Sequence, residues 1–82
     1  MKMTIEKLKT AVAAIGFPEE ALALGGHAEQ AYCLEQDPDG KWEAYWRERG
    51  RKHELKRFDD EEAACYYMLG KLAYTQLISK KI

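Results

Sequence analysis

The alternation of hydrophobic and polar residues changes its period along the chain, and these changes mark the predicted elements. A first helix is indicated by apolar residues at helical spacing: Ile5, Leu8, Val12 and Ile15. Thr4 suits the N-cap of this helix, and Gly16 suits its C-terminal stop. Pro18 then begins a second helical segment, which is too short for more than a turn or two before Gly25.

Three strands are predicted where the period becomes two, at residues 31–36, 41–48 and 51–58. The turns at 37–40 and 49–50 separate them, and both place glycine where positive φ is needed. Closing the hairpins at these turns predicts a register: Tyr32 with Trp46, Cys33 with Tyr45, Leu34 with Ala44, Ala44 with Leu55, Trp46 with His53, Tyr45 with Glu54, and Glu43 with Lys56.

This register sorts the side chains onto two different faces of the sheet. The predicted inner face is apolar: Tyr32, Leu34, Trp42, Ala44, Trp46 and Leu55. The predicted outer face is largely charged and open to solvent: Cys33, Glu35, Glu43, Tyr45, Arg47, Lys52, Glu54 and Lys56. A slip of one residue would destroy the sorting, so the pattern supports the register.

The last helix has the clearest predicted start. Asp59 is placed as the N-cap, Glu62 completes a capping box, and Phe58 suits a hydrophobic staple. The helix is expected to run to about Ser79, with the core stripe Cys65, Met68, Leu69 and Leu72. A second apolar stripe lies on another side of this helix: Tyr67, Tyr74 and Ile78.

The predicted order is therefore α-β-β-β-α, in the α+β class. It forms a three-stranded antiparallel meander with both helices packed on one face, because only one face is apolar.

The chain has 82 residues, of which 46% are hydrophobic and 33% charged, which predicts a single globular domain over residues 1–82. No apolar run is long enough to span a membrane, and the N-terminus lacks a signal-peptide pattern. Cys33 and Cys65 lack any metal-type or disulfide-rich pattern, so we expect reduced thiols in a cytoplasmic protein.

Charge is unevenly distributed although the net charge is only −1. Residues 19–39 carry acidic residues and no lysine or arginine, residues 41–57 carry seven bases against three glutamates, and residues 59–62 are all acidic. Segregated blocks in a nearly neutral chain argue against general polyanion binding and favour a protein partner.

The sequence shows no pattern typical of catalysis, of a cofactor site or of a metal site. His27 and His53 have no ligand at metal-binding spacing, and Gly25-Gly26 does not match a phosphate-binding loop. The carboxylates at 59–62 are explained by helix capping, without a partner for acid–base work. We therefore expect a protein that is not an enzyme and holds neither cofactor nor metal.

The α-β-β-β-α order resembles the double-stranded-RNA-binding domain over the whole chain. That resemblance implies phosphate contacts from lysines at the start of the last helix, where this chain has four carboxylates at 59–62. The chain therefore departs from the pattern at the motif that binds RNA. A nucleic-acid-binding module remains an alternative, and its bases would be Arg47, Arg49, Arg51, Lys52, Lys56 and Arg57.

A second resemblance covers residues 30–75. The Trp-rich strand 41–48, the turn Glu48-Arg49-Gly50 and the helix start 58–65 are similar to small bacterial immunity proteins paired with polymorphic or contact-dependent toxins. The resemblance implies a non-enzymatic protein that binds one cognate toxin and blocks its active site or substrate entry. The contact residues of such proteins vary, so it assigns no site.

Candidate partner-binding residues therefore come from the charge and aromatic pattern of this chain. They form an acidic segment and the open sheet face: Glu29, Glu35, Asp37, Asp39, Glu43, Tyr45, Arg47 and Glu54. A nuclease toxin with a basic cleft would favour the acidic residues. A homo-oligomeric regulatory domain, associating through the open sheet face or the tyrosine stripe, is a further alternative, and the sequence does not fix the oligomeric state.

Overall fold

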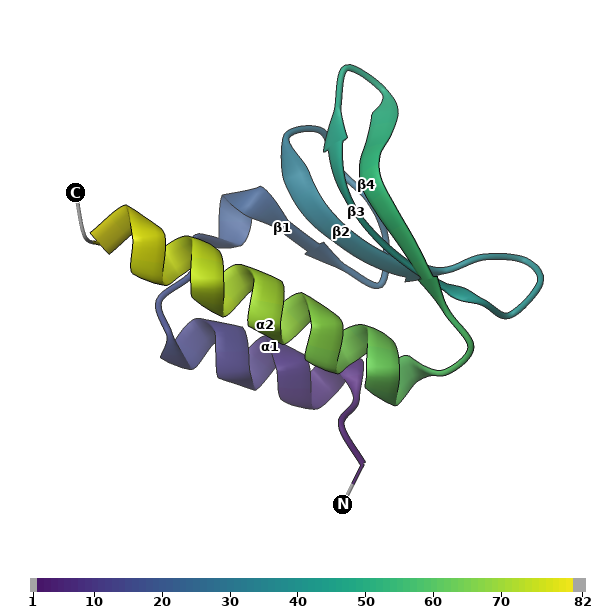
Figure 1. Cartoon of the computed structure of the whole chain (residues 1–82), viewed down its shortest axis with the longest axis horizontal. Coiled ribbons are helices and arrows are strands. Elements are labelled where there is room, and N and C mark those ends of the chain that lie inside the picture. Colours follow the sequence, from purple (N-terminus) through teal and green to yellow (C-terminus); the bar gives the residue numbers. More distant parts are fainter. Residues whose placement is uncertain (1, 81–82) are drawn as a thin grey trace.

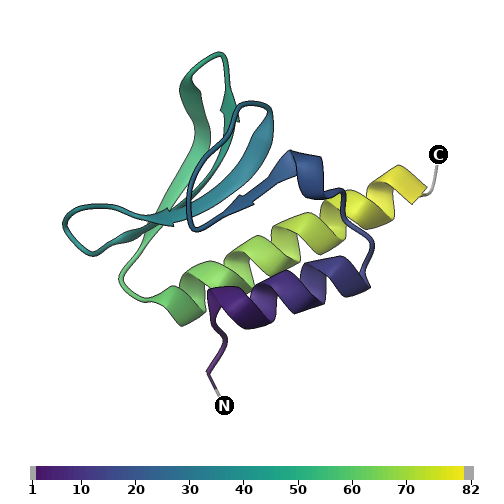
Figure 2. The same cartoon turned by 180° about the vertical axis from the view of Figure 1, so that it is seen from behind.

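The computed structural model describes residues 2–80 and confirms the α+β class. Two helices lie on the same side of an open, twisted four-stranded sheet (Figures 1 and 2). The elements in chain order are α1 (Ile5–Ala14), the 3₁₀ turn η1 (Glu19–Ala21), β1 (Leu22–Leu24), β2 (Ala31–Gln36), β3 (Trp42–Glu48), β4 (Arg51–Phe58) and α2 (Glu61–Lys80). The molecule is flat, with principal extents of 40 × 36 × 17 Å.

The sheet corrects the predicted three-stranded meander. Its strand order is β1-β2-β3-β4, and the additional strand β1 runs parallel to β2. The sequence prediction missed β1 because its three residues, Leu-Ala-Leu, lie in a segment that has the pattern of a short helix. After β1 the chain turns at Gly25 (φ +88°), whose N–H donates to the carbonyl of Leu34 at 2.7 Å.

The predicted register between β2 and β3 is confirmed. Tyr32 pairs with Trp46, and Leu34 pairs with Ala44. Between β3 and β4 the predicted pair Trp46–His53 is also present. Beyond it the predicted pairing is wrong: Ala44 faces Lys56 instead of Leu55, Glu43 faces Arg57 instead of Lys56, and Tyr45 has no direct partner in the ladder.

A β-bulge in β4 causes this change of register. Only Tyr45 lies between the paired residues of β3, whereas Glu54 and Leu55 lie between their partners in β4. Glu54 has a φ of +56°, in the left-handed region. The extra residue turns Leu55 away from the helices, and this side chain is 40% exposed, so its predicted inward position is wrong.

The main core lies between the helices and the sheet and contains the predicted stripe of α2. Its buried residues are Leu8, Val12, Phe17, Leu34, Ala44, Ala64, Cys65, Met68 and Leu72. Thr4 caps α1 as predicted, because its Oγ1 accepts from the N–H of Lys7 at 3.3 Å. At α2 the capping residue is Asp60 instead of Asp59: Asp60 Oδ1 accepts from the N–H of Ala63 at 2.7 Å.

The two glutamates at the start of α2 attach the N-terminal segment to this helix. Glu61 accepts from the N–H of Ile5 at 3.0 Å, and Glu62 accepts from the N–H of Met3 at 3.1 Å. The predicted role of Glu62 in a capping box is therefore replaced by a contact between two elements far apart in the sequence.

A second, smaller core lies on the opposite face of the sheet. It contains Ala31, Cys33 and Tyr45, packed against Ala23. The segment 25–30 runs back beside these residues, and the Cys33 thiol lies 3.6 Å from the carbonyl oxygen of Ala28. Tyr45 is only 3% exposed, so its predicted exposure on this face is wrong.

The turn between β3 and β4 has type I′ geometry, which suits glycine at its second position but not arginine at its first. Arg49 (φ +54°) and Gly50 (φ +72°) both have positive φ. Asparagine adopts this conformation more readily than arginine, so Arg49→Asn should raise the free energy of unfolding by roughly 0.5–1 kcal/mol. Urea denaturation would measure the gain, with Arg51→Asn in the adjoining strand as the control. An equal gain at both positions would contradict this explanation.

Candidate functional site

The structure divides the predicted partner-binding residues between two faces of the sheet. Glu35, Glu43, Tyr45 and Arg47 lie on the face opposite the helices, with Asp37 and Asp39 in the adjoining turn, and Glu54 lies on the side of α2. The acidic members of the outer face are largely compensated by ion pairs within the chain. The pairs are Arg47–Glu29 (2.6 Å), Lys52–Glu43 (2.6 Å), Arg57–Glu43 (3.5 Å) and Arg57–Asp37.

Glu35 contacts two side chains of this face. It accepts a hydrogen bond from the Tyr45 hydroxyl and lies 3.3 Å from Nδ1 of His27. Burial raises the pKa of Glu35, but the hydrogen bonds with Tyr45 and His27 outweigh it, so the net pKa lies below its ordinary value. Burial, and then the neighbouring Glu35, raise the pKa of Tyr45. Glu35 and Tyr45 therefore form a linked pair that stabilises the second core.

The variant Tyr45→Phe should reveal this link through its dependence on pH. At about pH 7 the loss of the hydrogen bond to Glu35 should lower the free energy of unfolding by about 1–2 kcal/mol. A carboxyl group with a lowered pKa stabilises the fold above its unfolded pKa, which for Glu35 is near the ordinary 4.5, and this stabilisation is lost as the pH falls through the folded pKa. Urea denaturation should therefore show a smaller difference between wild type and variant at about pH 3. A difference that does not change with pH would rule out Glu35 as the partner that matters.

The bases proposed for nucleic-acid binding are also partly compensated. Arg47, Lys52 and Arg57 each form an ion pair with a carboxylate of this chain. Because phosphate affinity depends on free positive charge, these pairs reduce the attraction that the basic hairpin exerts on RNA or DNA.

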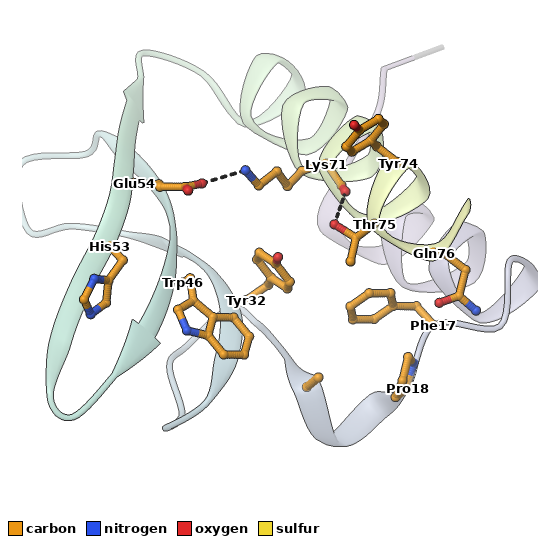
Figure 3. Close-up of a pocket in the computed structure, with 11 residues that line it drawn as sticks. Phe17, Pro18, Tyr32, Trp46, His53, Glu54, Lys71, Tyr74, Thr75 and Gln76 are labelled. Atoms are coloured by element: carbon orange, nitrogen blue, oxygen red, sulfur yellow. Dashed lines mark hydrogen bonds and ion pairs between the residues drawn. The ribbon is translucent and has the colours of Figure 1, made fainter. Parts of the chain in front are cut away.

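A cleft of about 530 Å³ opens between the β3–β4 hairpin and the C-terminal half of α2, and none of the sequence patterns predicted it. Figure 3 shows this cleft, with β4 on one side and α2 on the other. The residues that line it are Phe17, Pro18, Ala21, Tyr32, Trp46, His53, Glu54, Lys71, Tyr74, Thr75 and Gln76. They come from the segment after α1 and from η1, β2, β3, β4 and α2, so that only the complete fold brings them together.

Three aromatic rings form a continuous row along the cleft. The rings of Tyr32 and Trp46 meet edge to face with centroids 4.8 Å apart, and those of Phe17 and Tyr32 do so at 6.1 Å. The indole Nε1 of Trp46 donates to Glu48 at 2.9 Å, which fixes the ring in place. These contacts hold the row in place. Tyr32 and Trp46 present partly exposed aromatic surface to the cleft (Figure 3), whereas Phe17 belongs to the buried main core.

Polar contacts hold the two walls of the cleft. Lys71 of α2 donates to Glu54 of β4 at 2.6 Å (Figure 3), so the bulge that turns Leu55 outward also directs Glu54 toward the helix. This ion pair lowers the pKa of Glu54 and raises that of Lys71. Further along α2, Gln76 donates to the carbonyl oxygen of Gly16 at 3.0 Å and joins this helix to the segment that follows α1.

The sequence prediction placed Tyr32 and Trp46 correctly on the face toward the helices, although it treated them as core. It did not anticipate Phe17 or Lys71 as neighbours of these rings, since they come from segments that are distant in the sequence. Glu54 is the one predicted partner-binding residue that the structure places in the cleft. The aromatic content, at 11% of the chain, is the signal in the sequence that could have indicated such a surface.

Comparisons of the chain with models of known protein families, with curated proteins and with solved structures found no match. Within residues 2–80, no cluster of three or more histidine, cysteine or acidic side chains has the arrangement needed to hold a metal ion. No helix in that part of the chain combines the length and the apolar character needed to cross a membrane.

Proposed function

We propose that this protein is an immunity-type binding protein, which neutralises a cognate bacterial toxin by direct contact and uses the aromatic cleft as its docking site. The observation that carries the proposal is the fixed row of Phe17, Tyr32 and Trp46 in a cleft of about 530 Å³. Rigid aromatic side chains give large contact area at low entropic cost and dominate binding energy at protein interfaces. The resemblance of residues 30–75 to immunity proteins supports the same function.

The chemistry of the cleft indicates what it would accept. An apolar or aromatic side chain of the toxin fits against the aromatic row, where burial contributes most to affinity. The Lys71–Glu54 pair and His53 lie at the edge, where a polar group of the toxin can exchange hydrogen bonds with them. The ion pairs on the outer face leave that face less free charge for a partner, which is why we now favour the cleft over the acidic residues.

The proposed location is the cytoplasm, where an intracellular toxin would act. Cys33 and Cys65 are both free and buried, in separate cores on opposite faces of the sheet, so they are not placed to form a disulfide. Burial raises the pKa of Cys33, and it raises that of Cys65 to about 11, so both thiols stay protonated and unreactive at neutral pH.

The test is co-expression with the product of the adjacent gene. The two proteins should co-purify, and cells that express the toxin should survive only when this protein is present. If the cells die although both proteins are shown to be expressed, the proposed immunity function is wrong. The alternative of nucleic-acid binding is tested by a mobility-shift titration with duplex and single-stranded RNA at low salt, where phosphate contacts are strongest.

A further inference from the structure

The solvent-facing side of α2 lacks the charges that a surface helix normally carries. Four large apolar side chains of this helix are exposed: Tyr66 (55%), Tyr74 (66%), Leu77 (63%) and Ile78 (44%). Between Glu62 and Lys80 the one charged residue is Lys71, which is engaged with Glu54 in the cleft. Figure 1 shows α2 lying across the front of the molecule with no other element in front of it. A helix that is apolar on its outer side as well as its inner side is typical of an element with a partner on both sides.

A glycine lies at the centre of this exposed face. Gly70 is in the middle of the 20-residue helix, and a Cβ atom built at this position meets nothing within 4 Å. Glycine in the interior of a helix is destabilising relative to alanine. No contact within the described chain requires its small size, so the monomer gives no reason for it. Close approach of another backbone would give one.

The face is also symmetric about Gly70. Tyr66 and Tyr74 lie four residues to either side of it, and Ala63 and Leu77 lie seven residues to either side. Positions four and seven residues from Gly70 fall on the same side of a helix. If two α2 helices pack antiparallel around a two-fold axis at Gly70, each Tyr66 therefore lies beside Tyr74 of the other copy, and each small Ala63 meets the larger Leu77.

We propose that two copies of this chain form a dimer through the solvent-facing side of α2, with Gly70 at the two-fold axis. An interface of this kind is isologous, and it requires the self-complementary pattern that the helix has. The antiparallel arrangement also opposes the two helix dipoles, which favours a second copy of α2 as the occupant.

The available area suits a modest dimer. A tyrosine side chain contributes about 150–250 Å², and the four large apolar side chains are roughly half exposed, so together they offer on the order of 400 Å² per copy. Backbone at Gly70 and neighbouring small residues add to this, which brings the total for both copies near the lower limit of about 1,000 Å² for a specific interface. We therefore expect a weak dimer whose population depends on concentration.

Sedimentation velocity of the whole chain, over about 1 to 500 µM, tests the proposal. Wild type should change from mainly monomer to a substantial fraction of dimer, as expected for dissociation in the range of about 10–100 µM. Gly70→Leu should be monomeric throughout, although it improves helix propensity, because its side chain blocks close approach. Leu55→Glu, at an exposed apolar residue of β4, is the matched control and should dimerise like wild type. Circular dichroism confirms that each variant is folded.

Cross-linking tests the symmetry independently. In the Gly70→Cys variant, the cysteines of the two copies lie side by side at the two-fold axis, so mild oxidation should give a covalent dimer. Leu77→Cys alone should give little covalent dimer. A mixture of the Ala63→Cys and Leu77→Cys chains should again cross-link. Tyr74 is left unchanged in all of these variants, because it also lines the cleft. A loss of dimerisation in them can therefore be distinguished from a loss of toxin binding. A wild-type chain that stays monomeric at about 500 µM, or a dimer that Gly70→Leu does not affect, would overturn the proposal.

Discussion

Leu34→Ala should lower the free energy of unfolding by about 3 kcal/mol, whereas Leu55→Ala should lower it by less than about 0.5 kcal/mol. Both leucines were predicted on the inner, apolar face of the sheet. Leu34 is fully buried between the sheet and the helices, so its truncation leaves a cavity in the main core. Leu55 is 40% exposed because the bulge at Glu54 turns it outward, so its truncation removes little packing.

Urea denaturation at about 25 °C measures both differences under the same conditions. A domain of this size is expected to have a free energy of unfolding of roughly 4–12 kcal/mol, so Leu34→Ala should remain measurable but much weakened. The denaturant slope should be unchanged in both variants, because the surface exposed on unfolding is nearly the same. Equal losses at the two positions would show that β4 lacks the bulge and that its register follows the turn at 49–50 without interruption.

The parts of the fold that the sequence predicted are those that local rules determine. The two hairpin turns, the start of α1 at Thr4 and the pairing of β2 with β3 all follow from turn chemistry, capping and alternation. In each case the residues that specify the feature lie within a few positions of it. The inward position of Trp46 and the buried stripe of α2 were predicted for the same reason.

The features that were missed depend on contacts between distant segments. Strand β1 is three residues long, and only its pairing with β2 makes it a strand. The bulge at Glu54 lacks the glycine that usually marks positive φ. Lys71, which forms an ion pair with Glu54, lies 17 residues further along the sequence. Tyr45 is buried because Cys33 of β2 packs against it and Lys52 of β4 lies over its ring, 5.0 Å from the centroid, which alternation along a single strand cannot reveal.

The same distinction applies to the candidate site. The charge pattern indicated an acidic patch, but the ion pairs on the outer face depend on the fold. Lys52–Glu43 needs β4 beside β3, and Arg47–Glu29 needs the segment 25–30 beside β3. The cleft in turn lies between β4 and the C-terminal half of α2, which are separate in sequence, and there Trp46 and Tyr32 stay partly uncovered. Aromatic content could suggest a surface of this kind, but not its position.

Trp46→Ala should weaken binding of the cognate toxin by roughly 30- to 1,000-fold, if the cleft is the docking site as proposed. The loss corresponds to about 2–4 kcal/mol, which is typical of a central tryptophan in an interface. Trp46 is the largest ring of the aromatic row, and it is fixed by its contacts with Tyr32 and Glu48. A toxin side chain that packs against this ring would lose most of its buried apolar contact.

Isothermal titration of the purified pair measures this loss directly, and circular dichroism confirms that the variant is folded at the temperature used. Asp39→Ala provides the matched comparison, because Asp39 is exposed in the turn that adjoins the outer face and was itself a predicted contact. If the toxin docks in the cleft, Asp39→Ala should change its affinity by less than about threefold, since charges outside the centre of an interface contribute little to affinity. The opposite result, with a large loss at Asp39 and none at Trp46, would move the docking site to the outer face. Toxin binding would then depend on the charge pattern of the outer face instead of the aromatic row.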